Sequence, residues 1–231
     1  MLTALYFRVL NVAPDRLDDP QRDIYIQSKG HAVGCYYCVL AEAGFFPVEW
    51  LETYQHANSH LPGHPVRQKT PGIELNTGAL GHGFACCGGA GAGREEKQQH
   101  PPHFLITGDG ELAEGSNWEA APAAAHYGLD NLVIINDKNN LQLAGPTREI
   151  MNTDPLADKW RAFGMEVSEC RVTTWPRWSR PSRGYSRTVN RTLLLPTPRK
   201  ARGSPLSRAP GVAPPGAERR RDRSGAGGTE R

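Results

Sequence analysis

The residues best suited to chemistry lie in two short segments, the GDG turn at 108–110 and the loop around Asn139. HFLIT (103–107) predicts a buried strand before the first segment, and LVIIND (132–137) predicts another before the second. The two glycines let the backbone turn sharply and come close to a ligand. The helix expected after them would offer unpaired N–H groups to a phosphate. The sequence therefore predicts a phosphate-binding turn at the end of a strand.

Asp109 and Asn139 supply oxygen ligands of the kind that divalent cations prefer. Both should emerge at carboxyl ends of parallel strands, where open α/β sheets bind ligands. The backbone carbonyl of Leu141, just beyond Asn139, is a third hard donor. Such a set suits Mg²⁺ or Ca²⁺, with diphosphate oxygens and water completing the coordination. GDG and DKNN alone are common turn and loop sequences, so the prediction depends on their spacing within a strand–helix–strand context.

The elements that must position these residues alternate along the chain. Helices are predicted at YYCVLAEAGFF (36–46), PVEWLETYQ (47–55), ELAEGSNWEAAPAAAHYG (111–128) and PLADKWRAF (155–163), and MEVSEC (165–170) is a third strand. Gly128 and Gly164 are expected to end the last two helices, and Pro122 to kink the helix that contains it. Residues 56–83 resemble a loop. Alternating strands and helices predict an α/β fold with a doubly wound, mostly parallel sheet.

Charge divides the 231-residue chain into two parts. Residues 171–231 contain 15 Lys or Arg against 3 Asp or Glu, which leaves 12 against 21 for residues 1–170. The acidic first part has the composition of a globular domain. The second part is rich in Arg and Pro, and we expect it to be a disordered tail because it lacks periodic apolar residues.

Several classes of protein are not expected from the composition. The net charge of +3 does not indicate a nucleic-acid binder, and no apolar run approaches the about 18–20 residues of a membrane span. No secretory signal is evident at the start. Five cysteines without framework spacing fit a reducing cytoplasm. Cys35-x-x-Cys38 lies in an apolar helical pattern, so we expect it to be structural.

The two chemical segments also resemble a known family. GDGELAEGSNWEAA and LDNLVIINDKNNLQLAGPT are similar to the thiamine-diphosphate motif of transketolases. Further similar segments are LTALYFRVLNV, SKGHA (28–32), GHP (63–65) with TPGIELNTGALGHG (70–83), and PLADKWRAFGMEV. The resemblance is to short, split transketolases whose N-terminal half is a separate polypeptide. It covers residues 1–86 and 104–170 and implies the thiamine-diphosphate-binding fold.

The resemblance implies thiamine diphosphate and Mg²⁺ or Ca²⁺ as cofactors. It assigns Asp109, Asn139 and the Leu141 carbonyl to the metal, Gly108 and Gly110 to the diphosphate, Gly78 and Leu80 to a loop on the aminopyrimidine ring, His31 and His64 to the channel for the cofactor and sugar donor, and Glu114 and Glu119 to a subunit interface near the cofactor. His31, His64 and Glu114 are the catalytic candidates among them. Without the motifs, the two histidines would be interpreted as loop residues bonded to backbone carbonyls.

The activity implied is transfer of a two-carbon ketol unit from a ketose phosphate to an aldose phosphate, in the pentose phosphate pathway. The partner would be a C-terminal, pyrimidine-binding subunit that brings the glutamate activating the cofactor ring, in a dimer or heterotetramer. Neither nucleic acid nor a membrane is an expected partner. The alternatives are a 2-oxo acid dehydrogenase E1 component, a deoxyxylulose-phosphate synthase, or a truncated remnant without activity.

Three departures from the family pattern shape the expected domains. The chain opens at LTALYF, without the GSGHPGG-type segment that precedes it in the family, so we expect residues 1–170 to be an N-terminally truncated cofactor domain. CGGAGAGREEKQQHPPHF (87–104) replaces an apolar helix. Residues 171–231 do not continue the family pattern.

Shifting the reading frame by one base lets LLLPTPRKARGSPLSR (193–208) read VVIANTTKGKGVSFIE, and 87–104 can be restored similarly with chosen codons. We therefore interpret these segments as frameshifted and expect little or no activity from the chain in this form. The alternative for the tail is a genuine basic extension that binds RNA or acidic surfaces.

Overall fold

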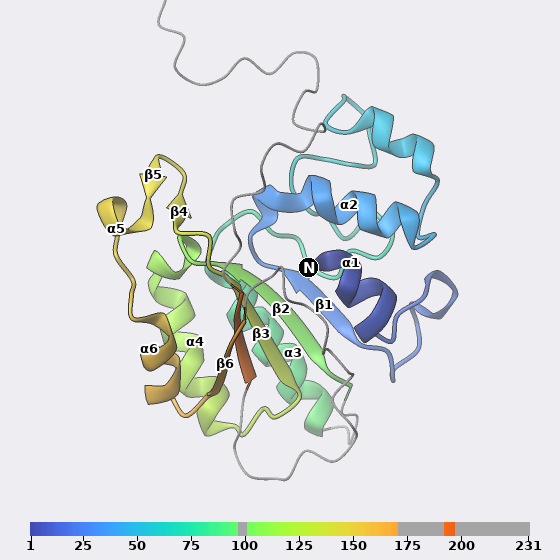
Figure 1. Cartoon of the computed structure of the whole chain (residues 1–231). Helices are drawn as coiled ribbons and strands as arrows, with labels where there is room; N and C mark the ends of the chain where they lie inside the picture. The colour runs from blue at the N-terminus through green and yellow to red at the C-terminus, as the bar shows by residue number, and fades with distance from the viewer. Residues whose placement is uncertain (97–100, 171–191, 197–231) are drawn as a thin grey trace, which may run out of the picture. The chain divides into compact units, whose positions relative to one another are not determined.

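The computed structural model describes residues 1–96, 101–170 and 192–196, all within the unit Met1–Arg199. Five parallel strands form one sheet, in the order β1-β2-β3-β7-β6 (Figure 1). Their bounds are Ile24–Gln27 (β1), His103–Gly108 (β2), Leu132–Asp137 (β3), Thr192–Pro196 (β7) and Glu166–Cys170 (β6). The short strands β4 (Leu141–Gln142) and β5 (Gly145–Pro146) form an antiparallel pair.

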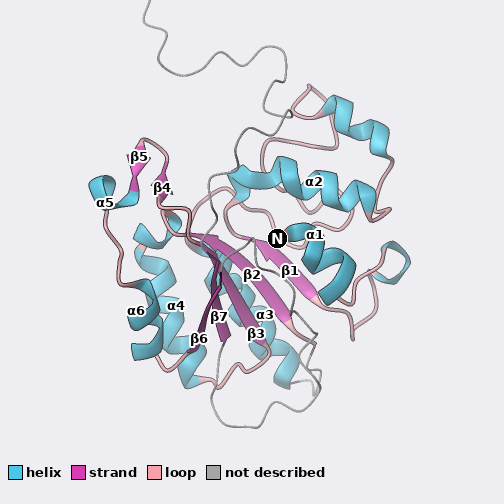
Figure 2. Ribbon diagram, viewed as in Figure 1, coloured by secondary structure: helices cyan, strands magenta, loops and turns pink. Residues whose placement is uncertain are grey.

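Helices connect the strands and cover the sheet (Figure 2). The α-helices are Leu2–Ala4 (α1), Val33–Glu42 (α2), His82–Glu96 (α3), Gly115–His126 (α4), Thr147–Ile150 (α5) and Leu156–Ala162 (α6). A π-helical turn, Leu5–Val9, continues α1, and 3-10 turns occur at Pro14–Arg16, Gly30–Ala32, Val48–Thr53 and Glu111–Ala113. Among the described residues, none of the helices combines the length and apolar character that crossing a membrane requires.

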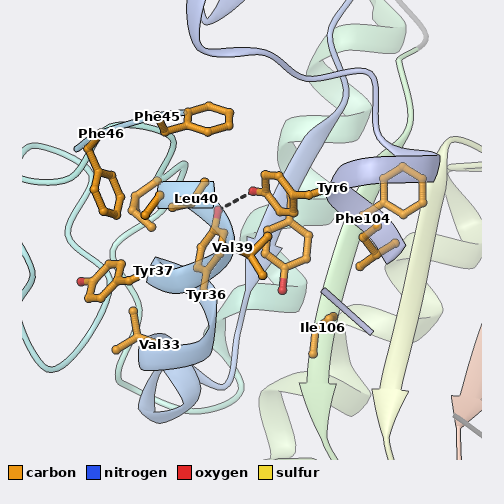
Figure 3. Close-up of a cluster of buried hydrophobic side chains, with 14 of the residues drawn as sticks. Tyr6, Val33, Tyr36, Tyr37, Val39, Leu40, Phe45, Phe46, Phe104 and Ile106 are labelled. Carbon is orange, nitrogen blue, oxygen red and sulfur yellow. Dashed lines mark hydrogen bonds between the residues drawn. The ribbon is translucent and has the colours of Figure 1, made fainter. Parts of the chain in front are cut away.

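Successive strand side chains point into two different cores because side chains alternate along a strand. Phe104 and Ile106 of β2 join a core with α2, whereas Leu105 between them joins a second core with α3, α4 and α6. The first core is rich in aromatic residues, and within it the Tyr6 hydroxyl donates a hydrogen bond of 2.9 Å to the Tyr36 hydroxyl (Figure 3). The sheet is therefore the middle layer of an α/β sandwich.

The predicted α/β class and parallel sheet are confirmed. The strands predicted at 103–107, 132–137 and 165–170 are β2, β3 and β6. Gly128 and Gly164 follow α4 and α6 with φ of 61° and 80°, the left-handed geometry that ends a helix at glycine.

Other predictions differ from the structure. The expected helix over 47–55 is a 3-10 turn, and the one over 111–128 is divided at Glu114 into a 3-10 turn and α4. β1 was not predicted, because its four residues IYIQ are all buried and show no alternation.

The structure differs in two places from the expectations for the aberrant segments. Helix α3 extends through Glu96, so residues 87–96 do not interrupt the helix as expected. Within the supposed tail, TLLLP forms β7 and pairs with both β3 and β6. A short apolar run bounded by turn residues is sufficient for a central strand of the sheet, even inside an Arg/Pro-rich sequence. The rest of the predicted tail, 171–191 and 197–231, and residues 97–100 lie outside the described residues.

Candidate active site at the carboxyl edge of the sheet

Strands β1, β2 and β3 end at the same edge of the sheet because they are parallel. Gly108, the last residue of β2, is in register with Asp137, the last residue of β3. The segment SKG (28–30) leaves β1 at this edge, where GDG (108–110) leaves β2 and DKNN (137–140) leaves β3 (Figure 1). The three segments thus line the position where open α/β sheets bind ligands.

Asp109 joins the GDG turn to the loop after β3. It is 2% exposed. Oδ2 accepts a hydrogen bond of 2.6 Å from the Asn140 backbone N–H, and Oδ1 accepts one of 3.0 Å from the Gly110 N–H. Burial raises the pKa of Asp109, and the N–H groups of Asn140, Gly110 and Asn139 act in the opposite direction. Among the described residues, the partners of this buried carboxylate are neutral N–H donors, which leaves it well suited to a positive ion.

The other two candidate metal ligands lie on the same loop. The Asn139 side-chain Oδ1 accepts a hydrogen bond of 2.9 Å from the Leu141 N–H, and both residues are exposed. The Leu141 carbonyl oxygen lies 3.1 Å from the position that a Cβ on Gly110 would occupy. This close approach explains the need for glycine at 110, and it places the carbonyl beside the residue that follows Asp109.

The structure also brings together two of the three catalytic candidates, His31 and His64. His31 lies in the 3-10 turn Gly30–Ala32, and a Cβ on Gly30 would lie 2.7 Å from Thr77 Oγ1. His64 packs on Gly78, whose φ is +155° and whose added Cβ would lie 3.3 Å from His64 Cδ2. Both imidazoles are exposed. The predicted loop residue Gly78 is therefore adjacent to both histidine-bearing turns, while the Leu80 carbonyl lies 3.1 Å from Nδ1 of His82.

Electrostatic neighbours shift the titration of His31. Burial lowers the pKa of His31, and the positive charge of Lys29 lowers it further. Glu111 acts in the opposite direction, and His64 adds a smaller lowering effect. The imidazole therefore favours its neutral form, which can exchange a proton or accept a hydrogen bond from a sugar hydroxyl.

Glu114 and Glu119, the predicted interface residues, are both exposed. Glu114 precedes α4, and its Cβ lies 2.7 Å from the position of a Cβ on Gly81. Glu114 is thus next to the loop that contains Gly78 and Leu80. Glu119 lies one turn further along α4.

Two charged groups at this edge were missed by sequence reasoning. Lys29 forms an ion pair with Asp137, across the end of β2. Glu111 is buried and bonds to Ser28, Gly81 and Gly108. The segment SKGHA contains Lys29 and was a signal for it, but an acidic residue in the first turn after GDG resembles an ordinary helix-dipole residue.

Within the described part of the chain, no three His, Cys, Asp or Glu side chains form a cluster that could hold a metal. A metal at this edge would depend on a mixed set of one carboxylate, one amide oxygen and one carbonyl. Mg²⁺ is bound in this way when substrate phosphates supply other ligands. The residues present therefore fit a metal–diphosphate group.

Comparison with known proteins decides the family. Residues 1–174 match the model of the transketolase thiamine diphosphate binding domain. The chain belongs to the transketolase family. This confirms the predicted family and the predicted cofactor thiamine diphosphate, and it does not favour the other thiamine-diphosphate enzymes considered as alternatives.

Relatives in this family include whole transketolases and proteins named as transketolase subunits. An apulose-4-phosphate transketolase subunit from Actinobacillus succinogenes is 64% identical over 170 residues, which are 74% of this chain and 62% of that protein. The 6-deoxy-6-sulfo-D-fructose transketolase subunit SqwG of Clostridium sp. is 41% identical, over 72% of this chain and 61% of that protein. Human transketolase is 37% identical, over 71% of this chain and 26% of its own length.

Solved structures agree with the fold. A Pichia stipitis transketolase variant superposes with a TM-score of 0.71 and 26% identity, covering 85% of this chain and 31% of the other. The chain spans less than two thirds of the length of the apulose-4-phosphate transketolase subunits that it matches.

Proposed function

We propose that this chain is the diphosphate-binding subunit of a two-chain, thiamine-diphosphate-dependent transketolase. The observation that carries the proposal is the hydrogen bond of Asp109 to Asn140, which joins the GDG turn to the loop of Asn139 and Leu141. In this proposal, Asp109, Asn139 and the Leu141 carbonyl hold Mg²⁺, or Ca²⁺ in its place. In the same proposal, Gly108 and Gly110 form the turn that would bind the diphosphate.

Thiamine diphosphate, when bound, supplies the carbanion chemistry that moves a two-carbon ketol unit between sugars. The chain's own residues bind and orient the reactants. Gly78 and Leu80 contact the aminopyrimidine ring in this proposal, and His31 and His64 hydrogen-bond the sugar donor and exchange protons with it. Neutral His31 suits this role because its pKa is lowered.

A pyrimidine-binding subunit is the proposed partner. Support comes from the relatives that are named as subunits of a transketolase, and from the exposed Glu114 beside the candidate cofactor loop, which would lie at the shared interface. The assembled enzyme would be a dimer or heterotetramer. A reducing compartment such as the cytoplasm suits the free thiols of the described residues Cys35, Cys38, Cys86 and Cys87.

The proposed reaction transfers a ketol unit from a ketose phosphate to an aldose phosphate. Apulose 4-phosphate is the first donor to assay, because the relative that carries this substrate in its name is 64% identical. Donors of the pentose phosphate pathway form the second set.

We also propose that residues 171–231 arise from a shifted reading frame. The family match ends at residue 174, close to the point where the charge pattern changes. The shifted frame reads VVIAN where β7 now begins, so both readings supply an apolar strand to the same position of the sheet. The nucleotide sequence of codons 80–231 tests this proposal. The proposal is refuted if neither shifted reading frame of this stretch encodes a protein sequence that matches the relatives.

The metal assignment predicts a large effect of Asp109→Ala. Removing this carboxylate deletes the only charged protein ligand, so Mg²⁺-dependent binding of thiamine diphosphate should be lost, and Asn139→Ala should weaken it about tenfold. Isothermal titration calorimetry on the full chain with its pyrimidine-binding partner measures both. Asp158→Ala, an exposed aspartate on α6 paired with Arg161, is the control and should bind normally. Unchanged binding by Asp109→Ala would refute the assignment.

A further inference from the structure

Glu111 is a buried carboxylate that accepts hydrogen bonds from three separate segments. It is 3% exposed. Oε1 accepts from the Ser28 hydroxyl and, at 3.0 Å, from the Gly81 N–H. Oε2 accepts from the Gly108 N–H at 3.1 Å. We name this set of four residues the Glu111 junction.

Each partner in the Glu111 junction begins or ends a segment of the candidate site. Ser28 follows β1 and precedes the turn with His31. Gly81 closes the loop of Gly78, and Gly108 opens the GDG turn. One side chain thus fixes the spacing of the three segments that the proposed function assigns to the cofactor and sugar.

The Glu111 junction is closely packed as well as bonded. Gly81 has φ of +85°, and its carbonyl accepts a hydrogen bond of 3.1 Å from the Ser116 hydroxyl. A Cβ on Gly83, two residues later, would lie 2.5 Å from Ser28 Cβ. Gly81 is therefore held at both its N–H and its carbonyl, and no residue larger than glycine fits at position 83 beside Ser28.

A carboxylate side chain matches this set of donors. Two of the three are backbone N–H groups, which cannot reverse their role, and a carboxylate accepts through both oxygens. A glutamine has one acceptor oxygen, so its NH₂ group would face the N–H of Gly81 or of Gly108. One buried N–H would then lose its partner, which is costly in a dry environment.

We propose that Glu111 is a positioning residue for the cofactor. It does not touch the cofactor in this proposal. It holds the ends of β1, of the Gly78 loop and of β2 at the spacing that Mg²⁺ and thiamine diphosphate require. The inference rests on the proposed function and deepens it.

The test is Glu111→Gln in the full chain, assembled with its pyrimidine-binding partner. We expect the dissociation constant for Mg²⁺–thiamine diphosphate to rise about tenfold or more, as when an outer-shell partner of a metal site is removed. Hydrogen exchange should also become faster at either the Gly81 or the Gly108 amide, because the single acceptor oxygen of glutamine can keep only one of these two hydrogen bonds. These two measurements report the site directly and do not require turnover.

The matched control is Glu74→Gln, the same substitution at the opposite end of β1. Glu74 is largely buried and forms a bidentate ion pair with Arg22, which precedes β1. The Glu74→Gln variant should have a lower melting temperature than the parent, and its dissociation constant for Mg²⁺–thiamine diphosphate should stay within about twofold of the parent's. The decisive case is that the two variants lower the melting temperature by the same amount. If the dissociation constant then also rises equally in both, Glu111 has a merely structural role and the proposal is overturned.

Ser28→Ala provides a second variant if Glu111→Gln does not fold. It removes one donor and leaves both backbone bonds of Glu111, so a smaller but measurable loss of cofactor affinity is expected. Unchanged affinity in Ser28→Ala, or in a folded Glu111→Gln, overturns the inference alone. If the parent itself does not bind thiamine diphosphate, the proposed function fails instead.

Discussion

The start and the middle of helix α3 use glycine in opposite ways. At its start, Gly83 lies against Ser28, and an added Cβ would be 2.5 Å from Ser28 Cβ and 3.0 Å from its Cα. Further along the helix, a Cβ on Gly89 would meet nothing within 4 Å, and one on Gly88 would lie at an ordinary 3.6 Å from Leu129 Cδ1. Gly83, near the start of the helix, is at the candidate active site. The part of the helix with Gly88 and Gly89 leads away from that site.

This difference separates two reasons for which glycine can occur in a helix. At Gly83 the missing side chain permits close approach between the helix and the end of β1, which the Glu111 junction also fixes. At Gly89 no approach requires it, so its backbone freedom only weakens the helix. Among Gly83, Gly88, Gly89 and Gly91 of α3, the closest approach is at Gly83, ahead of Gly91, whose added Cβ would lie 3.3 Å from Asn131 Oδ1.

Gly83→Ala should break the packed end and have the larger effect on stability. The new methyl group meets side-chain and backbone atoms of Ser28, so either β1 or α3 must move. We expect the free energy of unfolding to fall by about 1–3 kcal/mol, as for overpacked cores. Urea denaturation monitored by tryptophan fluorescence measures this change. Cofactor affinity should fall with it, because Ser28 belongs to the Glu111 junction.

Gly89→Ala should sharpen the comparison by changing stability in the opposite direction. Gly89 is exposed, lies inside α3 and has free space around it. Alanine should raise the free energy of unfolding by about 0.5–1 kcal/mol through its higher helix propensity. The same urea experiment applies, with cofactor affinity unchanged. A destabilised Gly89→Ala would mean that the middle of α3 is as closely packed as its start.

Sequence reasoning found the parts of the fold that depend on local signals. β2 and β3 were predicted because each is an apolar run next to turn residues, and Gly128 and Gly164 marked two helix ends. α3 was underestimated between 87 and 96, because several glycines lower helix propensity while the buried Phe84 and Cys87 anchor the helix to the core. Tertiary packing there outweighs propensity.

The candidate site also contains residues that could be predicted from the sequence and residues that could not. The approach of Asp109 to the loop of Asn139 follows from two strands ending at one edge, and could be predicted. The roles of His31 and His64 came from the family resemblance alone. The Glu111 junction could not be predicted, because its partners Ser28 and Gly81 are 83 and 30 residues away along the chain.

The smallest expected effect concerns the charge at the packed end. Lys29 lowers the pKa of His31, after the larger effect of burial, and Lys29 is paired with Asp137. Lys29→Met keeps an apolar stem but removes the positive charge and leaves the Asp137 carboxylate without this partner. Both changes favour the protonated imidazole, so the pKa of His31 should rise. An NMR titration of the imidazole protons, with the signal assigned by its loss in His31→Gln, measures the change.

The direction of this shift also determines how His31 affects stability. In the unfolded chain His31 titrates near about 6.5, and in the folded chain its pKa is lower, so the unfolded state binds more protons between the two values. The contribution of His31 to stability is therefore present above this range, and the free energy of unfolding falls as the pH drops through it.

In Lys29→Met the folded and unfolded pKa values of His31 lie closer together, so the loss of stability below about pH 6.5 should be smaller. Lys138→Met, which removes a lysine that is paired with Asp154 and is not among the groups that shift the pKa of His31, serves as the control and should keep the parent's pH profile around the His31 titration. If both variants changed this pH profile equally, the change in stability would follow from the net charge of the protein. The packed end of α3 would then have no distinct electrostatic environment.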